Sequence, residues 1–188
     1  AKGIRKLQDS LLKAIDKRAE KSPNTLHELF IRKDNPILIK TGREILGEDG
    51  FNQIRKQWFD NLVENSKSII DGEEVISPSK LANNLRRLRG SLPEIASDNP
   101  ELAQKLIDLS DISKLLTRGT KVTKGSQTAY LRDALIGVRG LLAAPLVRTE
   151  AGRKFLTTGY PVLTQKAASL AGRAGQVGVQ LGLQETTK

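Results

Sequence analysis

The sequence contains no cysteine and no methionine, and its only histidine is His27. The absence of cysteine excludes disulfides, thiolate metal sites and thiol redox chemistry within this chain. A single histidine cannot form a zinc site without further histidine or cysteine ligands, and no serine or aspartate at a suitable spacing suggests a catalytic triad. We therefore expect His27 at the surface or at a helix cap, and we expect no metal site and no cofactor.

Long apolar runs are also missing. No stretch of about 18 to 20 apolar residues occurs, which argues against a conventional transmembrane helix. The first residues form a charged amphipathic pattern without the apolar segment of a secretory signal. Because the sequence starts with Ala1 and contains no methionine, we expect a processed product or a fragment of a longer polypeptide.

Aromatic residues make up only 4% of the 188 residues, so the core must consist mainly of leucine, isoleucine, valine and alanine. This composition favours packed helices over a β-sandwich. We expect an all-α protein, either a multi-helix bundle or an irregular helical array, with an Ala/Gly-rich helix at the C-terminal end. The length suits one domain of ordinary size or two small helical ones.

The net charge of +10 is unevenly distributed. Residues 118–188 carry 11 basic and 3 acidic side chains, a net charge of +8, whereas residues 67–117 carry 7 basic and 8 acidic ones. This asymmetry suggests an anionic partner for the C-terminal third, either nucleic acid, a lipid surface or an acidic protein. A solvated basic surface without a partner is the alternative.

The stretch from Leu46 to Arg89 holds the only tryptophan and two of the four phenylalanines. Apolar side chains at helical spacing predict a helix over residues 51–65 with a buried stripe, made of Phe51, Ile54, Trp58, Phe59, Leu62 and Val63. The polar residues are expected on the opposite, solvated face: Gln53, Arg55, Lys56, Asp60 and Glu64. Ser77 and Pro78 predict the start of a second helix, which Gly90 ends.

This stretch also resembles a known family. The run Leu46-Gly-Glu-Asp-Gly-Phe51, the Trp58-Phe59 helix and Ser77-Pro-Ser-Lys-Leu-Ala-Asn-Asn-Leu85 are similar to internal virion proteins of tailed bacteriophages, the DNA-ejection or DNA-transfer proteins. Leu146-Val-Arg-Thr-Glu-Ala-Gly-Arg-Lys-Phe-Leu156, followed by an Ala/Gly-rich tail, resembles their C-terminal portion. The resemblance covers about two thirds of the chain and consists of helices and caps, without an invariant chemical motif.

The remaining signals predict further helices and one linker. Asp71-Gly72 could form the turn of a short hairpin, but a solvated connection is the preferred interpretation. Asp98 or Asn99 and Pro100 begin another helix. Residues 118–126 form a basic linker, which divides the chain into an N-terminal helical bundle, 1–117, and a C-terminal helical segment, 127–188. Further helices are expected at residues 4–20, 25–33, 37–46, 127–143 and 150–157.

The linker and the segment after it hold the candidate contacts to an anion or to DNA. Ser126 can cap the following helix, whose N-terminus could hold an anion beside two lysines of the linker; a mobile solvated hinge is the alternative. Gly137 and Gly140 lie inside that helix, so we expect tertiary contacts to compensate for them. The candidate contacts are Lys121, Lys124, Arg132, Arg139, Arg148, Arg153, Lys154 and Arg173.

The C-terminal helix, from Pro161 to about Leu183, is the candidate assembly face. One set of positions follows a heptad seam: Leu163, Ala167, Leu170, Ala174, Val177 and Leu181. Beside this seam runs a stripe of small residues, Ala168, Ala171, Gly175, Gly178 and Gly182. Such a stripe favours close contact with another helix, in an oligomer or at a membrane; a flexible tail is the alternative.

The resemblance implies a structural protein that leaves the virion interior with the genome and assembles into a conduit across the host cell envelope. Its expected partners are further copies of itself, other virion or ejection proteins, and double-stranded DNA or an anionic membrane surface. The alternative is a small basic helical nucleic-acid-binding protein. An enzyme is not expected, because the residues offer no paired carboxylates or other catalytic constellation.

Overall fold

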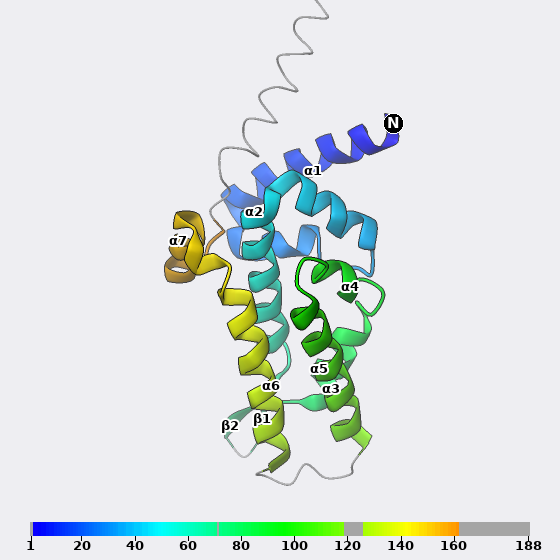
Figure 1. Ribbon diagram of the computed structural model, residues 1–188, viewed down its shortest axis with the longest axis vertical. Coiled ribbons are helices and arrows are strands. Elements are labelled where there is room, and N and C mark those ends of the chain that lie inside the picture. Colours follow the sequence, from blue (N-terminus) through cyan, green and yellow to red (C-terminus); the bar gives the residue numbers. More distant parts are fainter. Residues whose placement is uncertain (1, 71, 119–125, 162–188) are drawn as a thin grey trace, which may run out of the picture.

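The computed structural model describes residues 2–70, 72–118 and 126–161 (Figure 1). The fold is mostly helical, as the composition indicates, with one small two-stranded sheet. The elements are α1 (Lys2–Lys21), η1 (Pro23–Leu29), α2 (Pro36–Glu64), β1 (Lys67–Ile70), β2 (Glu73–Ile76), α3 (Pro78–Arg86), α4 (Leu92–Ile95), α5 (Pro100–Arg118), α6 (Ser126–Ala143), η2 (Leu146–Arg148) and α7 (Glu150–Thr158).

Helix α2 is the centre of the fold. It has two parts that meet at Gly47, whose φ of 68° lies in the left-handed region that glycine adopts without strain. Figure 1 shows the first part crossing the upper end of the molecule and the second running down its length. The break after residue 46 was expected, but the second part resumes directly after Gly47 rather than at residue 51.

The second part of α2 buries its aromatic stripe, as predicted. Trp58 is 4% exposed and Phe59 is fully buried, with the two rings packed edge to face at 6.2 Å. The expected polar face is wrong at two positions, because Gln53 and Arg55 are buried as well. Elements η1, α4, α6 and α7 all pack on α2, so it has little solvated surface.

The placement of His27 is a second correction, because this side chain is buried rather than exposed. It lies in the 3₁₀ helix η1, where a longer segment, 25–33, was expected to be helical. Its Nδ1 is 3.2 Å from Oε1 of Gln57, which also accepts a hydrogen bond from the His27 backbone N–H. Burial lowers the pKa of His27, more than the contact with Gln57 and the charge of Glu28 raise it. The imidazole thus joins η1 to α2.

The hairpin between α2 and α3 forms after all. Strands β1 and β2 pair antiparallel, with Lys67 opposite Ile76 and Ile70 opposite Glu73. Gly72 has a φ of 80°, which the tight turn requires. The hairpin was therefore given too little weight, although residues 69–70 and 72–74 are exposed, as expected for a solvated connection.

Helix starts are the best predicted local features. The Ser77 hydroxyl accepts from the Lys80 N–H at the start of α3, with Pro78 at the first helical position. Asn99 caps α5 by accepting from the Leu102 N–H, whereas Asp98, the other candidate cap, pairs with arginines instead. The expected caps of α3 and α5 are thus confirmed, with Asn99 as the residue that caps α5.

Helix α6 belongs to the same hydrophobic core as α2 and α5. Its buried residues Leu131, Leu135, Val138 and Leu142 are part of one cluster with Trp58. The described part of the predicted C-terminal segment therefore packs on the N-terminal helices, while most of the predicted linker, 119–125, lies outside the described residues. Tertiary contacts were expected at Gly140, but a Cβ there would meet open space, so packing does not explain this glycine.

Candidate nucleic-acid interface

A groove of about 430 Å³ lies between α3 and α5. We call it the α3–α5 groove. Its lining is basic and polar, with a single small apolar residue, Ala82. The lining residues are Ser79, Ala82, Asn83, Arg86, Arg89, Lys114 and Thr117.

The helical repeat explains how α3 builds this groove. Leu81 and Leu85 are fully buried where α3 packs along α5. Successive residues of an α-helix point about 100° apart, so residues three apart share a side. Arg86 is the last residue of α3 and Arg89 lies in the turn that follows, and both line the groove together with Lys114 of α5. Arg87 falls on another side of α3 and does not line the groove.

The groove keeps an excess of positive charge. Lys114 Nζ is 2.8 Å from Oδ1 of Asp111. The hydrogen bond and charge of Lys114, together with the charge of Arg89, hold the pKa of Asp111 below its usual value. Within the described part of the chain, neither Arg86 nor Arg89 forms an ion pair. Their guanidinium groups therefore keep donors for a ligand.

Such an arrangement suits phosphate groups. A guanidinium can donate two parallel hydrogen bonds to one phosphate, and hydroxyl and amide groups commonly add backbone contacts in nucleic-acid complexes. Ser79, Asn83 and Thr117 supply hydroxyl and amide groups in the same groove.

The basic residues predicted to contact an anion lie elsewhere. The five that the structure describes are all exposed and come from α6, η2 and α7: Arg132, Arg139, Arg148, Arg153 and Lys154. None lines the α3–α5 groove, because α5 lies between α3 and α6 and packs against both. Arg139 Nε is 3.7 Å from Oδ1 of Asp60 on α2, so part of its charge is compensated. Lys121, Lys124 and Arg173 lie outside the described residues.

The candidate assembly face also lies outside the described residues. All its members follow Pro161: Leu163, Ala168, Leu170, Ala171, Gly175, Val177, Gly178, Leu181 and Gly182. Their role stays a prediction. Within 2–70, 72–118 and 126–161, no helix combines the length and hydropathy that crossing a membrane requires.

Sequence reasoning gave too little weight to the groove residues. Arg86 and Arg89 were visible as part of the tightest basic cluster, and their three-residue spacing indicates a shared face. Lys114 gave no such signal, because it is separated from the cluster in sequence and reaches it only through the packing of α5 on α3. Residues 67–117 carry nearly equal numbers of basic and acidic side chains. The net charge of the segment therefore did not indicate the local excess of positive charge in the groove.

No group of histidine, aspartate and glutamate side chains in the described ranges is arranged to hold a metal ion. Comparison of the chain with models of protein families, with curated protein sequences and with solved structures gave no significant match. A functional interpretation therefore depends on the residues and on their arrangement.

Proposed function

We propose that this chain is a structural module of an internal virion protein of a tailed bacteriophage, of the DNA-ejection class. It acts by assembly: copies of the chain, with other virion proteins, form a conduit through which the genome is delivered across the host cell envelope. It resides first in the virion interior and then in the envelope. No bond-forming or bond-breaking step is part of this role.

The observation that carries the proposal is the resemblance of the stretch Leu46–Arg89 to these proteins. The features behind it, a capped helix with a Trp-Phe pair followed by an Asp-Gly connection and a Ser-Pro helix start, are the features that build the centre of the fold. The small-residue stripe after Pro161 is compatible with an assembly role, since small side chains let helices approach closely.

The test is the mass of the purified chain, measured by size-exclusion chromatography with light scattering. The full chain is compared with a version truncated before Pro161, which retains every residue of the described core, and with a full-length Gly175→Leu variant. We expect a discrete multimer for the full chain, a monomer for the truncated chain, and a weakened multimer for Gly175→Leu. A monomeric full chain would overturn the assembly role proposed for this face.

The second candidate function is binding of nucleic acid, and the α3–α5 groove favours it. Three cationic side chains gather there, and no ion pair of the two arginines is found in the described ranges. This candidate is compatible with the first, because the groove residues and the candidate assembly face are different parts of the chain.

Salt titration tests this second function. A protein that neutralises phosphates releases counterions, so its affinity for DNA falls steeply as salt rises. We expect the affinity for a short DNA duplex, measured by fluorescence anisotropy, to fall steeply between about 50 and 200 mM salt. Weak binding that hardly depends on salt would rule out this function, whatever the outcome of the assembly test.

A further inference from the structure

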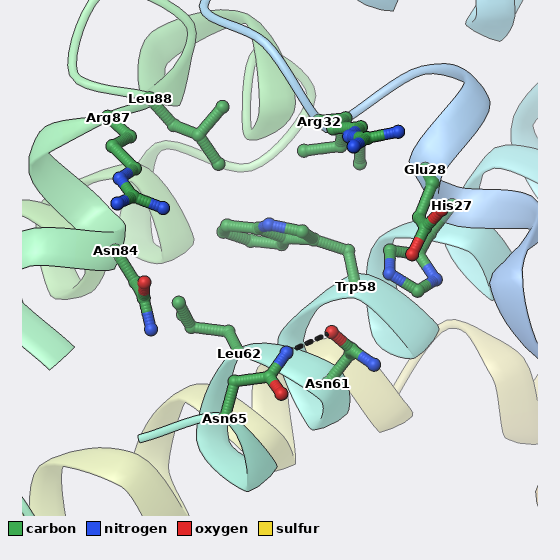
Figure 2. A pocket seen from close by; sticks show the side chains of 11 residues that line it. His27, Glu28, Arg32, Trp58, Asn61, Leu62, Asn65, Asn84, Arg87 and Leu88 are labelled. Atoms are coloured by element: carbon green, nitrogen blue, oxygen red, sulfur yellow. Dashed lines mark hydrogen bonds between the residues drawn. The ribbon is translucent and has the colours of Figure 1, made fainter. Parts of the chain in front are cut away.

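A second hollow, of about 170 Å³, lies on the other side of α3. We call it the Trp58 pocket. Figure 2 shows the indole in its middle, with Asn84, Arg87 and Leu88 on the α3 side. Three residues from α2 and the residues around η1 complete it. The complete lining is His27, Glu28, Ile31, Arg32, Trp58, Asn61, Leu62, Asn65, Asn84, Arg87 and Leu88.

The Trp58 indole presents a hydrogen-bond donor without a protein partner in the described part of the chain. The Trp58 side chain is 4% exposed, yet its indole N–H makes no hydrogen bond to any residue that the structure describes. Buried indole N–H groups usually have a partner. The Trp58 indole nitrogen keeps some access to the surface. Because Trp58 lines the pocket, a ligand in the pocket can reach this N–H. A donor in this position is available to an acceptor group of a ligand that displaces water from the pocket.

Further donors surround it. Asn65 Nδ2 donates to Oδ1 of Asn61 at 2.6 Å, which fixes the Asn61 amide and leaves its nitrogen for a ligand. Figure 2 shows Arg87 extending from α3 toward the indole, and Arg32 lies on the opposite wall. Neither arginine forms an ion pair within residues 2–70, 72–118 and 126–161. The pocket therefore offers the indole N–H, the Asn61 amide nitrogen and two guanidinium groups as donors, beside the amides of Asn65 and Asn84.

The only carboxylate of the pocket is already neutralised. Glu28 Oε2 is 2.9 Å from Arg18 NH1, outside the pocket lining. His27 adds no positive charge at neutral pH, because burial lowers its pKa. The two arginines thus set a positive potential in a small, partly apolar hollow, which favours a negatively charged ligand.

The size and the apolar walls narrow the choice among anions. Ile31, Leu62 and Leu88 line the pocket beside the indole. A cavity of about 150 Å³ accommodates a benzene ring, whereas pockets for drug-sized ligands span about 300–1,000 Å³. A bare phosphate would leave the apolar walls without contacts, while a carboxylate on a small apolar body would meet both the donors and the walls.

We propose that the Trp58 pocket binds a small organic carboxylate. The carboxylate lies against the Trp58 indole N–H and Arg87, and its apolar part lies against Ile31, Leu62 and Leu88. This site is separate from the α3–α5 groove and does not depend on the function proposed above.

The single tryptophan makes the test direct, because Trp58 is the only source of tryptophan fluorescence in this chain. The full chain is titrated with sodium propionate, sodium benzoate and inorganic phosphate, at constant ionic strength maintained with chloride. We expect a saturable change in Trp58 emission with propionate. Benzoate absorbs near the excitation wavelength, so its binding is measured by calorimetry, and we expect benzoate to bind as well. Phosphate is expected to bind at least tenfold more weakly than propionate.

Adjacent residues of α3 provide a matched pair of variants. Arg87→Gln removes a donor from the pocket, whereas Arg86→Gln removes the same charge on the groove side of the helix. We expect Arg87→Gln to weaken propionate binding at least tenfold and Arg86→Gln to change it less than twofold. Asn61→Asp, which keeps the acceptor for Asn65 but adds a negative charge, should abolish binding.

Three results would overturn the proposal: no saturable response in the unmodified chain, equal affinity in the Arg86 and Arg87 variants, or phosphate binding as tight as propionate. Both arginines are exposed, so loss of folding does not complicate the comparison. Far-UV circular dichroism during thermal unfolding checks that each variant is folded.

Discussion

The arginines of α2 and those of α3 have opposite surroundings. Arg55, in α2, is 1% exposed, and Arg43 beside it is largely buried. Arg86 and Arg87, at the C-terminal end of α3, are exposed and form no ion pair with the residues described. The same side chain therefore serves two purposes in this fold, one inside the protein and one at its surface.

Arg43 and Arg55, the inner arginines, form their ion pairs within the protein. Arg55 NH1 is 2.5 Å from Oδ1 of Asp98 and 3.1 Å from the carbonyl oxygen of Ile95, and Arg43 NH1 is 3.0 Å from the same carboxylate oxygen. Arg43 also lies over the ring of Phe51 at 4.4 Å. These contacts tie both parts of α2 to the segment between α4 and α5, so few donors remain for a ligand. Arg86 and Arg87, the outer arginines, keep their hydrogen-bond donors for a ligand.

The largest expected effect comes from breaking the inner network. Arg55→Gln leaves Asp98 with Arg43 as its only charged partner and opens space in the core. Because Asp98 is 30% exposed and keeps Arg43, no uncompensated buried charge remains. We expect the lost charge-assisted hydrogen bonds to lower the free energy of unfolding by about 1.5–3 kcal/mol, measured by urea denaturation with circular dichroism.

The matched control is Arg86→Gln, which removes the same charge from an exposed position. Surface substitutions of this kind usually change stability by less than about 0.5 kcal/mol. If both variants were equally stable, the inner network would not hold α2 in place and the contrast between the two sets of arginines would be lost.

The error at Arg55 shows what a sequence can and cannot reveal. This residue lies four positions after Phe51 and four before Phe59, so its spacing already places it on the apolar stripe. Its charge suggested solvent, and a partner 43 residues away, Asp98, could not be foreseen. Gln53 is different, because it lies on the opposite face and is buried only because elements pack all around α2.

Local signals predicted more than long-range contacts did. The predicted caps of α3 and α5 follow from a few adjacent residues. The cap of α7 is equally local, because the Thr149 hydroxyl accepts from the Gly152 N–H. The His27–Gln57 contact spans 30 residues, and the α3–α5 groove depends on how two helices pack. Neither is encoded in a short segment, so the sequence predicted His27 at the surface or at a helix cap and indicated no role for the groove.

The next largest effect concerns the outer arginines and DNA. The double variant Arg86→Gln/Arg89→Gln removes two groove cations, so the slope of the logarithm of affinity against the logarithm of salt should decrease by roughly two. We expect affinity for a DNA duplex to fall about tenfold or more near 0.1 M salt, as measured by fluorescence anisotropy.

Arg87→Gln is the control for this experiment, because Arg87 faces the Trp58 pocket rather than the groove. We expect Arg87→Gln to reduce the affinity for DNA less than Arg86→Gln or Arg89→Gln does. An equal loss from Arg86→Gln and Arg87→Gln would indicate general attraction to a basic surface and would remove the groove as a distinct interface.

The smallest effect is the acid response of the inner network. Partial burial alone would raise the pKa of Asp98, but the hydrogen bonds and charges of Arg55 and Arg43 hold it below the usual value of 3.8. A lowered pKa in the folded state means that this stabilisation is complete well above pH 3.8 and is lost as the pH falls below 3.8 through the folded value. His27, whose pKa is also lowered, gives an earlier loss of stability that begins as the pH falls below 6.5.

The Asp98→Asn variant tests this acid response in urea denaturation series between pH 7 and pH 3. We expect the variant to be less stable than the unmodified chain at pH 7 and to keep the loss of stability that begins near pH 6.5. Below pH 3.8 it should lose less of its stability than the unmodified chain. Equal losses below pH 3.8 would mean that Asp98 is bound no more tightly in the folded chain than in the unfolded one, and the inner arginines would then be buried without being stabilised by their carboxylate.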